Sequence, residues 1–219
     1  MIALIFFFAS LLDFESHKQQ LLLDGVHIPG WCRGGKAEKL MDSIHELKPQ
    51  LCVEIGSLAG SATYPMACTL RYLGQGILYA IDTWDNASCL EGLDPDDPNV
   101  TWWPSLGIDM EQTHRFFLDW ISRQGFQNIC HPMRMRSDQA AALFADGSID
   151  FLYIDGNISS SGSMADVTLF FPKVRSGGYI WLNLADLHTK KKAVGFLMRR
   201  CEWLKEKSVE THCILFRKN

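Results

Sequence analysis

The amino-acid sequence predicts one doubly wound α/β domain, in which helices cover both faces of a mainly parallel sheet. Its 219 residues suit a single domain of this kind. After Lys36, short apolar segments that read as strands alternate with segments in which apolar residues recur at helical spacing. Hydrophobic residues make up 47% of the chain and charged residues 21%, which excludes a disordered polypeptide.

The first half of the domain begins with a predicted helix over residues 36–47, which Pro49 ends. Its apolar residues lie on one stripe at 3.6-residue spacing: Leu40, Met41, Ile44 and Leu47. The apolar run LCVEIG (51–56) and the run ILYAID (77–82) are predicted strands, with a helix over 61–74 between them. This order indicates a right-handed βαβ unit with two parallel strands.

A long loop or lid is predicted over residues 83–108, because this stretch contains three prolines and the polar run LDPDDPN. Trp102 and Trp103 within it form either a wall of the binding site or part of the loop's own packing. Helical spacing returns over 109–123. Further strands are predicted over 128–135, 149–155 and 178–184, two more within 201–218, and helices over 137–144, 161–171 and 190–200. The predicted sheet therefore has seven strands.

A separate apolar segment precedes this domain. Residues 2–12 are apolar apart from Ser10, and Asp13 ends the run. Eleven residues are too few to span a bilayer, which takes roughly 20, so no transmembrane span is expected. The length suits a signal-peptide core, yet no Lys or Arg precedes it and no clear cleavage site follows. Residues 1–23 are therefore either a signal or anchor remnant or a packed extension of the domain 24–219. A cytoplasmic location is expected, with export or membrane association as the alternative.

Charge and cysteine usage disfavour two classes of protein. The formal net charge is −4, and the stretch between Arg71 and Arg115 holds eight acidic residues and no Lys or Arg, so no nucleic-acid partner is expected. The seven cysteines include no CxxC pair, which argues against a zinc site or a disulfide framework. A small-molecule partner is the expectation, and the oligomeric state stays open.

The most informative stretch is VEIGSLAGS, residues 53–61, at the predicted turn from the first strand of the sheet into a helix. Gly56 and Gly60 allow a sharp turn and the close approach of a ligand. A dinucleotide pyrophosphate binds bare amides at a helix N-terminus, and Glu54 would repel it. A carboxylate there suits instead a ligand with a cationic amino or sulfonium group, as S-adenosylmethionine has. A nicotinamide-dependent dehydrogenase is therefore a distant alternative.

A second carboxylate follows at the end of the next predicted strand. Asp82 is the last residue of ILYAID, 28 residues after Glu54. A carboxylate at this place can accept the protons of both ribose hydroxyl groups of a nucleoside. Because the carboxyl ends of neighbouring parallel strands meet at one edge of the sheet, the two acids predict a site for a cationic nucleoside.

These residues resemble the class I S-adenosylmethionine-dependent methyltransferases. The glycine loop VEIGSLAGS, IDTW after the second strand, IDGN after the fourth and GGYI in the fifth follow one another in the order of that family. The resemblance is closer to a small branch with IDTW or IDPW, IDGNH and GGYIWFDD, found in chlamydia-like bacteria. It covers residues 24–219 and implies a seven-stranded Rossmann-like methyltransferase sheet. The implied reaction is SN2 transfer of a methyl group to oxygen or nitrogen of a small molecule.

Carried over residue by residue, the resemblance implies that Glu54 holds the amino group of the cofactor and Asp82 its ribose. The other implied contacts are Gly56, Ser57, Gly60 and Ser61 at the methionine end, Thr83, Trp84 and Ser137 around the adenine, and Asp155 at the sulfonium and the acceptor. Three of these have an alternative that needs no cofactor. Gly56 can serve strand-to-helix packing, Ser137 a helix N-cap, and Trp84 the core.

The chain departs from the branch at the acceptor end. IDGNISSS has Ile158 where the branch has histidine, and GGYIWLNLAD has Asn183 and Leu184 where the branch has two acids. Related catechol-type enzymes hold Mg²⁺ with carboxylates at these two strand ends, so a divalent metal is not expected here.

The same departures remove the obvious general base. The remaining candidates for catalysis are Asp155, Asp186 and His188, and a solvated loop residue is the alternative for His188. The expected function is that of a methyltransferase. The alternative is a catalytically degenerate relative that binds the cofactor or a partner without turnover.

Overall fold

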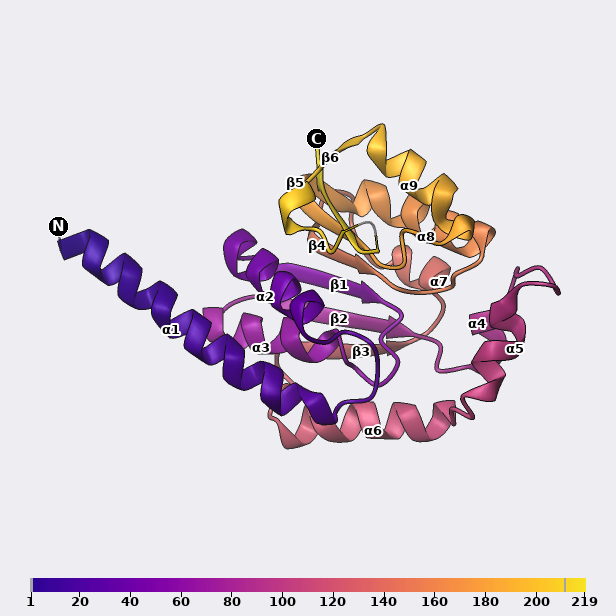
Figure 1. The fold of residues 1–219 in the computed structure, drawn as a ribbon, viewed down its shortest axis with the longest axis horizontal. Helices are drawn as coiled ribbons and strands as arrows, with labels where there is room; N and C mark the ends of the chain where they lie inside the picture. Colours follow the sequence, from indigo (N-terminus) through magenta and orange to yellow (C-terminus); the bar gives the residue numbers. More distant parts are fainter. Residues whose placement is uncertain (1, 211) are drawn as a thin grey trace.

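The computed structural model describes residues 2–210 and 212–219, and it contains one sheet with helices on both sides (Figure 1). The strands are β1 (Leu51–Ile55), β2 (Ile77–Asp82), β3 (Cys130–Arg134), β4 (Ile149–Ile154), β5 (Val174–Leu182), β6 (Cys201–Trp203) and β7 (Ile214–Lys218). Their order in the sheet is β3-β2-β1-β4-β5-β7-β6. The first five strands in this order are parallel, and β7 runs antiparallel to β5 and β6. The predicted doubly wound, mainly parallel sheet is confirmed.

The helices connect the strands as the βαβ pattern requires. They are α1 (Ile2–Asp24), α2 (Gly35–Leu47), α3 (Thr63–Leu73), α4 (Asn86–Leu90), α5 (Pro98–Ser105), α6 (Met110–Arg123), α7 (Ser137–Ala141), α8 (Ser160–Phe170) and α9 (Lys191–Met198). Short 3₁₀ turns occupy Gly25–His27, Phe171–Lys173, His188–Lys190 and Lys205–Lys207. The predicted boundaries differ most at β5, which begins at Val174 because this residue pairs with Ile149 of β4.

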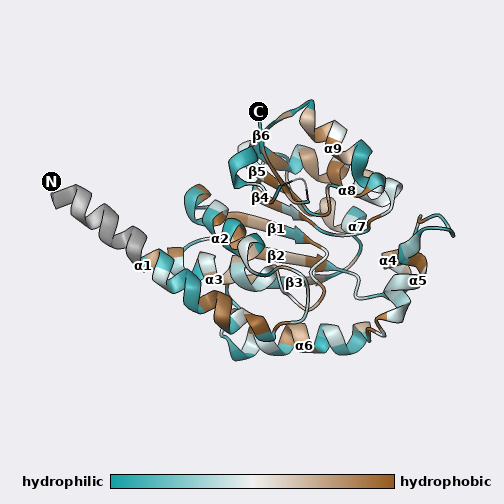
Figure 2. Cartoon of the chain, viewed as in Figure 1, coloured by the Kyte–Doolittle hydropathy of each residue, from teal (hydrophilic) through white to brown (hydrophobic). Residues whose placement is uncertain are grey.

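Two hydrophobic layers enclose the sheet, because successive side chains of a strand point to opposite faces. Cys52 and Tyr153 pack with residues of α1, α2, α3 and α6 on one face. Val53 and Ile154, their neighbours along β1 and β4, pack with residues of α7, α8 and α9 on the other. Hydrophobic residues fill most of the central strands (Figure 2). This burial leaves the strand ends as the places where polar groups can meet a ligand.

Residues 83–108 are not the continuous loop that the sequence predicts, since they contain α4 and α5. Aspartate side chains begin both helices. Asp85 accepts a hydrogen bond from Ser88 N at 3.0 Å, and Asp97 accepts one from Asn99 N at 2.9 Å. Pro98 follows as the first residue of α5. The backbone N–H at this position has no partner within a helix, so a proline, which has no N–H, fits there. The acidic, proline-containing run LDPDDPN therefore specifies the start of α5 as well as part of a loop.

The N-terminal segment forms a helix whose second half belongs to the domain. Phe14 is 2% exposed and stacks on His45 of α2 with 3.8 Å between ring centroids. Lys18 Nζ donates to Asp42, also on α2, at 2.6 Å. The side chains of residues 1–12 lie outside the described ones, so the choice between a signal remnant and a packed extension stays a prediction. In the described part of the chain, no helix is long and apolar enough to cross a membrane.

Gly56 fixes the contact between the end of β1 and the end of β4. Its φ is +86°, and a Cβ atom there would lie 2.2 Å from the backbone oxygen of Asp155. Gly56 N donates to Ile81 O at 2.9 Å, and Asp155 N donates to Ile55 O at 2.8 Å. The backbones therefore leave no room for a side chain at this position.

We expect Gly56→Ala to lower the free energy of unfolding by about 3 kcal/mol or more, because the added methyl group meets backbone in a left-handed conformation. Gly74→Ala is the matched control, since Gly74 has φ +66° with no atom within 4 Å of an added Cβ. It should cost only about 1 kcal/mol. Urea denaturation of both variants measures the difference. Equal losses would contradict the close-approach argument.

Candidate functional site

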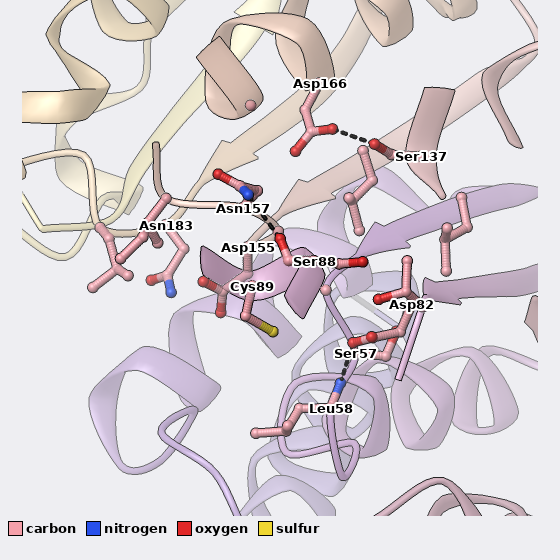
Figure 3. Close-up of a pocket in the computed structure, with 18 of the residues that line it drawn as sticks. Ser57, Leu58, Asp82, Ser88, Cys89, Ser137, Asp155, Asn157, Asp166 and Asn183 are labelled. Atoms are coloured by element: carbon pink, nitrogen blue, oxygen red, sulfur yellow. Dashed lines mark hydrogen bonds between the residues drawn. The ribbon is translucent and has the colours of Figure 1, made fainter. Parts of the chain in front are cut away.

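A cavity of about 680 Å³ lies at the carboxyl ends of the parallel strands. Each of the four central strands contributes at least one residue to its wall, at or just after the strand end. Among these residues are Gly56, Asp82, Asp155 and Asn183. Figure 3 shows Asp82, Asp155 and Asn183 around the same cavity. The switch point of a doubly wound sheet, between β1 and β4, is where such a fold is expected to bind ligands.

Glu54 supplies a buried carboxyl group to this cavity. Its Oε2 accepts hydrogen bonds from Thr63 Oγ1 at 2.5 Å and from Ser57 Oγ at 3.2 Å. Its Oε1 is buried and has no hydrogen-bond partner among the described residues. Burial raises the pKa of Glu54 to about 8. A buried acceptor without a partner is costly, so a ligand with a donor group would relieve this position.

Asp82 is held by the turns that follow β1 and β2. Its Oδ2 accepts from Leu58 N at 2.9 Å, and its Oδ1 accepts from Trp84 N at 2.7 Å. Burial raises the pKa of Asp82, and these backbone hydrogen bonds oppose the rise. Asp82 lines the cavity, and a carboxylate has lone pairs for about four hydrogen bonds in all. Asp82 is thus fixed in place while still able to accept from a ligand.

The residues of the glycine loop divide between ligand-facing and structural positions. Ser57 and Ser61 line the cavity. Ser61 Oγ also accepts from Cys32 N at 3.3 Å, which ties the loop to the segment before α2. Gly60 is outside the cavity wall, and a Cβ there would lie 2.6 Å from the ring of Trp120. The absence of a side chain lets Trp120 of α6 pack on the loop, and the implied cofactor contact of Gly60 stays a prediction.

The two residues after Asp82 point to different places. Thr83 lines the cavity, but Trp84 does not. Trp84 is 2% exposed, its Nε1 donates to Leu58 O at 2.8 Å, and its ring packs 5.2 Å from that of Phe117. Its left-handed backbone, with φ +46°, turns the side chain under the glycine loop. Of the two alternatives that the sequence left open, the core position is the one observed.

Ser137 lines the cavity together with an acid that sequence reasoning missed. Ser137 Oγ donates to Asp166 Oδ1 at 2.5 Å, as the dashed line in Figure 3 shows. Arg136, not Ser137, is the N-cap residue of α7. Asp166 is 3% exposed, and burial raises its pKa to about 6. The feature of the sequence that could have identified Asp166 is that it is a single acid in the otherwise uncharged helix SSGSMADVTLF.

The three predicted catalytic residues do not come together. Asp155 lines the cavity, whereas Asp186 and His188 are exposed and lie outside its wall. His188 is therefore a solvated residue. Asp186 contacts His212, which does line the cavity and was not among the predicted site residues. The missed signal was its position directly before the last strand, which is antiparallel to β5 and so starts at the ligand edge.

Aromatic side chains form one part of the cavity wall. Trp31, Trp102 and Trp103 line the cavity, and their ring centroids are 6.0 to 6.3 Å apart. Trp103 Nε1 donates to Asn86 Oδ1 at 3.1 Å, which joins α5 to α4. The two tryptophans of the predicted lid thus both pack on each other and contribute to the site.

The strand ends that carry Mg²⁺ in catechol-type enzymes have a different composition here. Asp155, Asn183, Ile158 and Leu184 line the cavity, and two of these four are apolar. Asn183 Oδ1 accepts from Cys213 Sγ at 2.8 Å, and its backbone oxygen accepts from the buried Lys190 Nζ at 3.0 Å. Among the described residues, no group of three His, Cys, Asp or Glu side chains is placed to hold a metal ion. The donor set does not fit a magnesium site.

Comparison with known proteins identifies the family. Residues 53–183 match the family model described as "Methyltransferase domain". None of the curated proteins matches the sequence. Among solved structures, the O-methyltransferase NovP has a TM-score of 0.64 at 16% identity, over 84% of this chain and 80% of that one.

Two further similar structures were determined with SAH. An O-methyltransferase from Bacillus cereus has a TM-score of 0.59 at 11% identity, over 93% of this chain and 91% of that one. A methyltransferase from Podospora anserina has a TM-score of 0.59 at 11% identity, over 84% of this chain and 78% of that one. At these identities the likeness concerns the fold, and the family match supplies the membership. The chain therefore belongs to the methyltransferase domain family, and its sheet has the fold of the solved methyltransferases.

Proposed function

We propose that this cavity binds S-adenosylmethionine and that the chain transfers its methyl group to an oxygen or nitrogen atom of a small molecule. The observation that carries the proposal is the unpartnered Oε1 of Glu54, buried in a cavity that Asp82 also lines. A cationic amino group satisfies the first carboxylate, and a ribose satisfies the second. A pyrophosphate would instead bring its negative charge next to the carboxyl groups of both Glu54 and Asp82.

The other cavity residues fit the remaining parts of this ligand. Ser57 and Ser61, beside Glu54, suit the methionine carboxylate end. Thr83 and Ser137 lie where the adenine would follow the ribose, and Asp166 can accept a hydrogen bond from an exocyclic amino group. Asp155, at the end of β4, would face the sulfonium and the acceptor.

When bound, the cofactor supplies an electrophilic methyl group on a positively charged sulfur atom. Glu54 and Asp82 would hold the cofactor at the ends of β1 and β2, so that its methyl group would pass to the acceptor as the carbon–sulfur bond breaks and the acceptor gives its proton to a base at the cavity. The chain's contribution is to hold the two reactants in line, since orientation alone can supply about 7–11 kcal/mol of the barrier.

The similar structures named as O-methyltransferases favour an oxygen acceptor. We propose that the acceptor is a small molecule, that transfer needs no divalent metal, and that it takes place in the cytoplasm. The motif order of the chlamydia-like branch supports placing the chain there.

A second candidate function is cofactor binding without turnover. Ile158 and Leu184 favour it, because both line the cavity where the related branch has polar groups. A transfer assay with radiolabelled S-adenosylmethionine, phenols, catechols and primary amines, with and without EDTA, separates the two. Labelled product that is unaffected by EDTA supports the enzyme. SAH binding with no product from any acceptor supports the degenerate relative.

We expect Asp82→Ala to weaken binding of S-adenosylhomocysteine (SAH) at least about tenfold, because charge-assisted hydrogen bonds to the ribose contribute roughly 1.5–3 kcal/mol each. Isothermal titration calorimetry measures the affinity. Asp146→Ala is the control, since Asp146 is exposed and outside the cavity wall. Binding of NAD without binding of SAH by the wild type would reject the proposal.

We expect Glu54→Gln to stabilise the ligand-free protein at high pH and to weaken SAH binding. The pKa of Glu54 is about 8 in the fold against an ordinary value of 4.5, so the folded state holds a proton that the unfolded state loses. The free energy of unfolding of the wild type therefore falls relative to the variant as pH rises from about 4.5 to about 8. Thermal unfolding across this range measures the gap.

Glu206→Gln, at an exposed position outside the cavity, serves as the matched control for the loss of one carboxylate. Its stability should follow the wild type at each pH. Parallel pH curves for the wild type and Glu54→Gln would show that Glu54 carries no such buried proton.

A further inference from the structure

One ionisable pair at the cavity has no part in holding the cofactor. His212 lies two residues before β7, whose first residue, Ile214, pairs with Leu182 at the end of β5. Ala185 N donates to His212 O at 2.8 Å, so the segment after β5 and the segment before β7 are joined. This pairing brings a histidine from the C-terminal tail to the ligand edge of the sheet, where His212 lines the cavity.

The imidazole ring is oriented by a carboxylate. His212 Nδ1 lies 3.0 Å from Asp186 Oδ1 and 3.2 Å from Asp186 Oδ2. An ionised carboxylate only accepts hydrogen bonds, so Nδ1 carries the hydrogen and donates it. In the neutral ring the lone pair is then on Nε2, the nitrogen left for a ligand. A ring fixed by a carboxylate in this tautomer is the arrangement of a general base.

The other side chains at this end of the cavity are less suited to remove a proton from a hydroxyl group. Asn183 has no basic atom, and its Oδ1 already accepts from Cys213 Sγ. Lys36 lines the cavity as a cation, which can stabilise a negative oxygen but has no free lone pair. Asp155 remains as a rival base on the opposite strand end.

We propose that His212 is the general base of the methyl transfer and that Asp186 is its positioning residue. This inference rests on the proposed function. Nε2 takes the proton of the acceptor hydroxyl as the oxygen bonds to the methyl carbon and the carbon–sulfur bond breaks. The resulting imidazolium is stabilised by the Asp186 carboxylate. The proton then leaves to solvent, since the His212 side chain is 44% exposed.

The test uses 4-nitrocatechol, whose visible absorption reports whether it is ionised. The probe is added to the complex of the full chain with SAH, at a pH below the pKa of the free probe. We expect the wild type to bind the probe as its anion, and His212→Ala to bind it protonated or not at all. Asp186→Asn should also lose ionisation, because an amide can donate to Nδ1 and favour the other tautomer. His27→Ala, at an exposed histidine outside the cavity wall, should behave as the wild type.

The same variants are then assayed for methyl transfer to the probe. His212→Ala should lose about 100-fold or more in kcat, with SAH affinity unchanged and with partial rescue by added imidazole. Full ionisation and transfer in His212→Ala, with loss in Asp155→Asn, would overturn the assignment in favour of Asp155. A wild type that binds SAH but neither binds nor ionises the probe would also overturn it while leaving the cofactor site intact. A wild type that does not bind SAH would reject the proposed function itself.

Discussion

The buried carboxyl group of Glu54 is the constraint around which the site is arranged. It sits at 0% exposure on the central strand β1, with one oxygen bonded to Ser57 and Thr63 and the other without a partner. Apolar residues would stabilise the core better at this position, because an isolated buried charge is strongly unfavourable. Its pKa of about 8 means that the empty site favours the protonated form near neutral pH. A cationic ligand would favour the ionised form, so the proposed ligand binding would be coupled to proton loss.

The close packing of the strand ends positions the glycine loop beside this carboxyl group. Gly56 brings the backbone of β1 against that of Asp155, and Gly60 lets Trp120 of α6 pack on the loop. Asp82 accepts from Leu58 N and Trp84 N, which holds the glycine loop to the end of β2. The loop is therefore determined by contacts on three sides, and its two serines face the cavity as a consequence.

The acceptor end follows a different chemistry from that of magnesium-dependent relatives. Where carboxylates would hold a metal ion, the chain has Leu184 and the amide of Asn183. A buried ammonium, Lys190 Nζ, donates to the backbone oxygen of Asn183. Other ionisable groups at this end are Asp155, Lys36 and the His212–Asp186 pair.

The sequence by itself determined the sheet and the cofactor half of the site. Alternation of short apolar strands with amphipathic helices is a local pattern, and Glu54, Gly56 and Asp82 lie at the ends of strands that this pattern locates. It could not decide between core and ligand for Trp84, because a left-handed backbone at one residue sets the direction of that ring. Nor could it find Asp166 or His212, which are far along the chain from the glycine loop. They reach the cavity only because α8 packs across the end of β4 and because β7 returns antiparallel beside β5. Strand order and side-chain direction are long-range properties, and only the tertiary structure decided them.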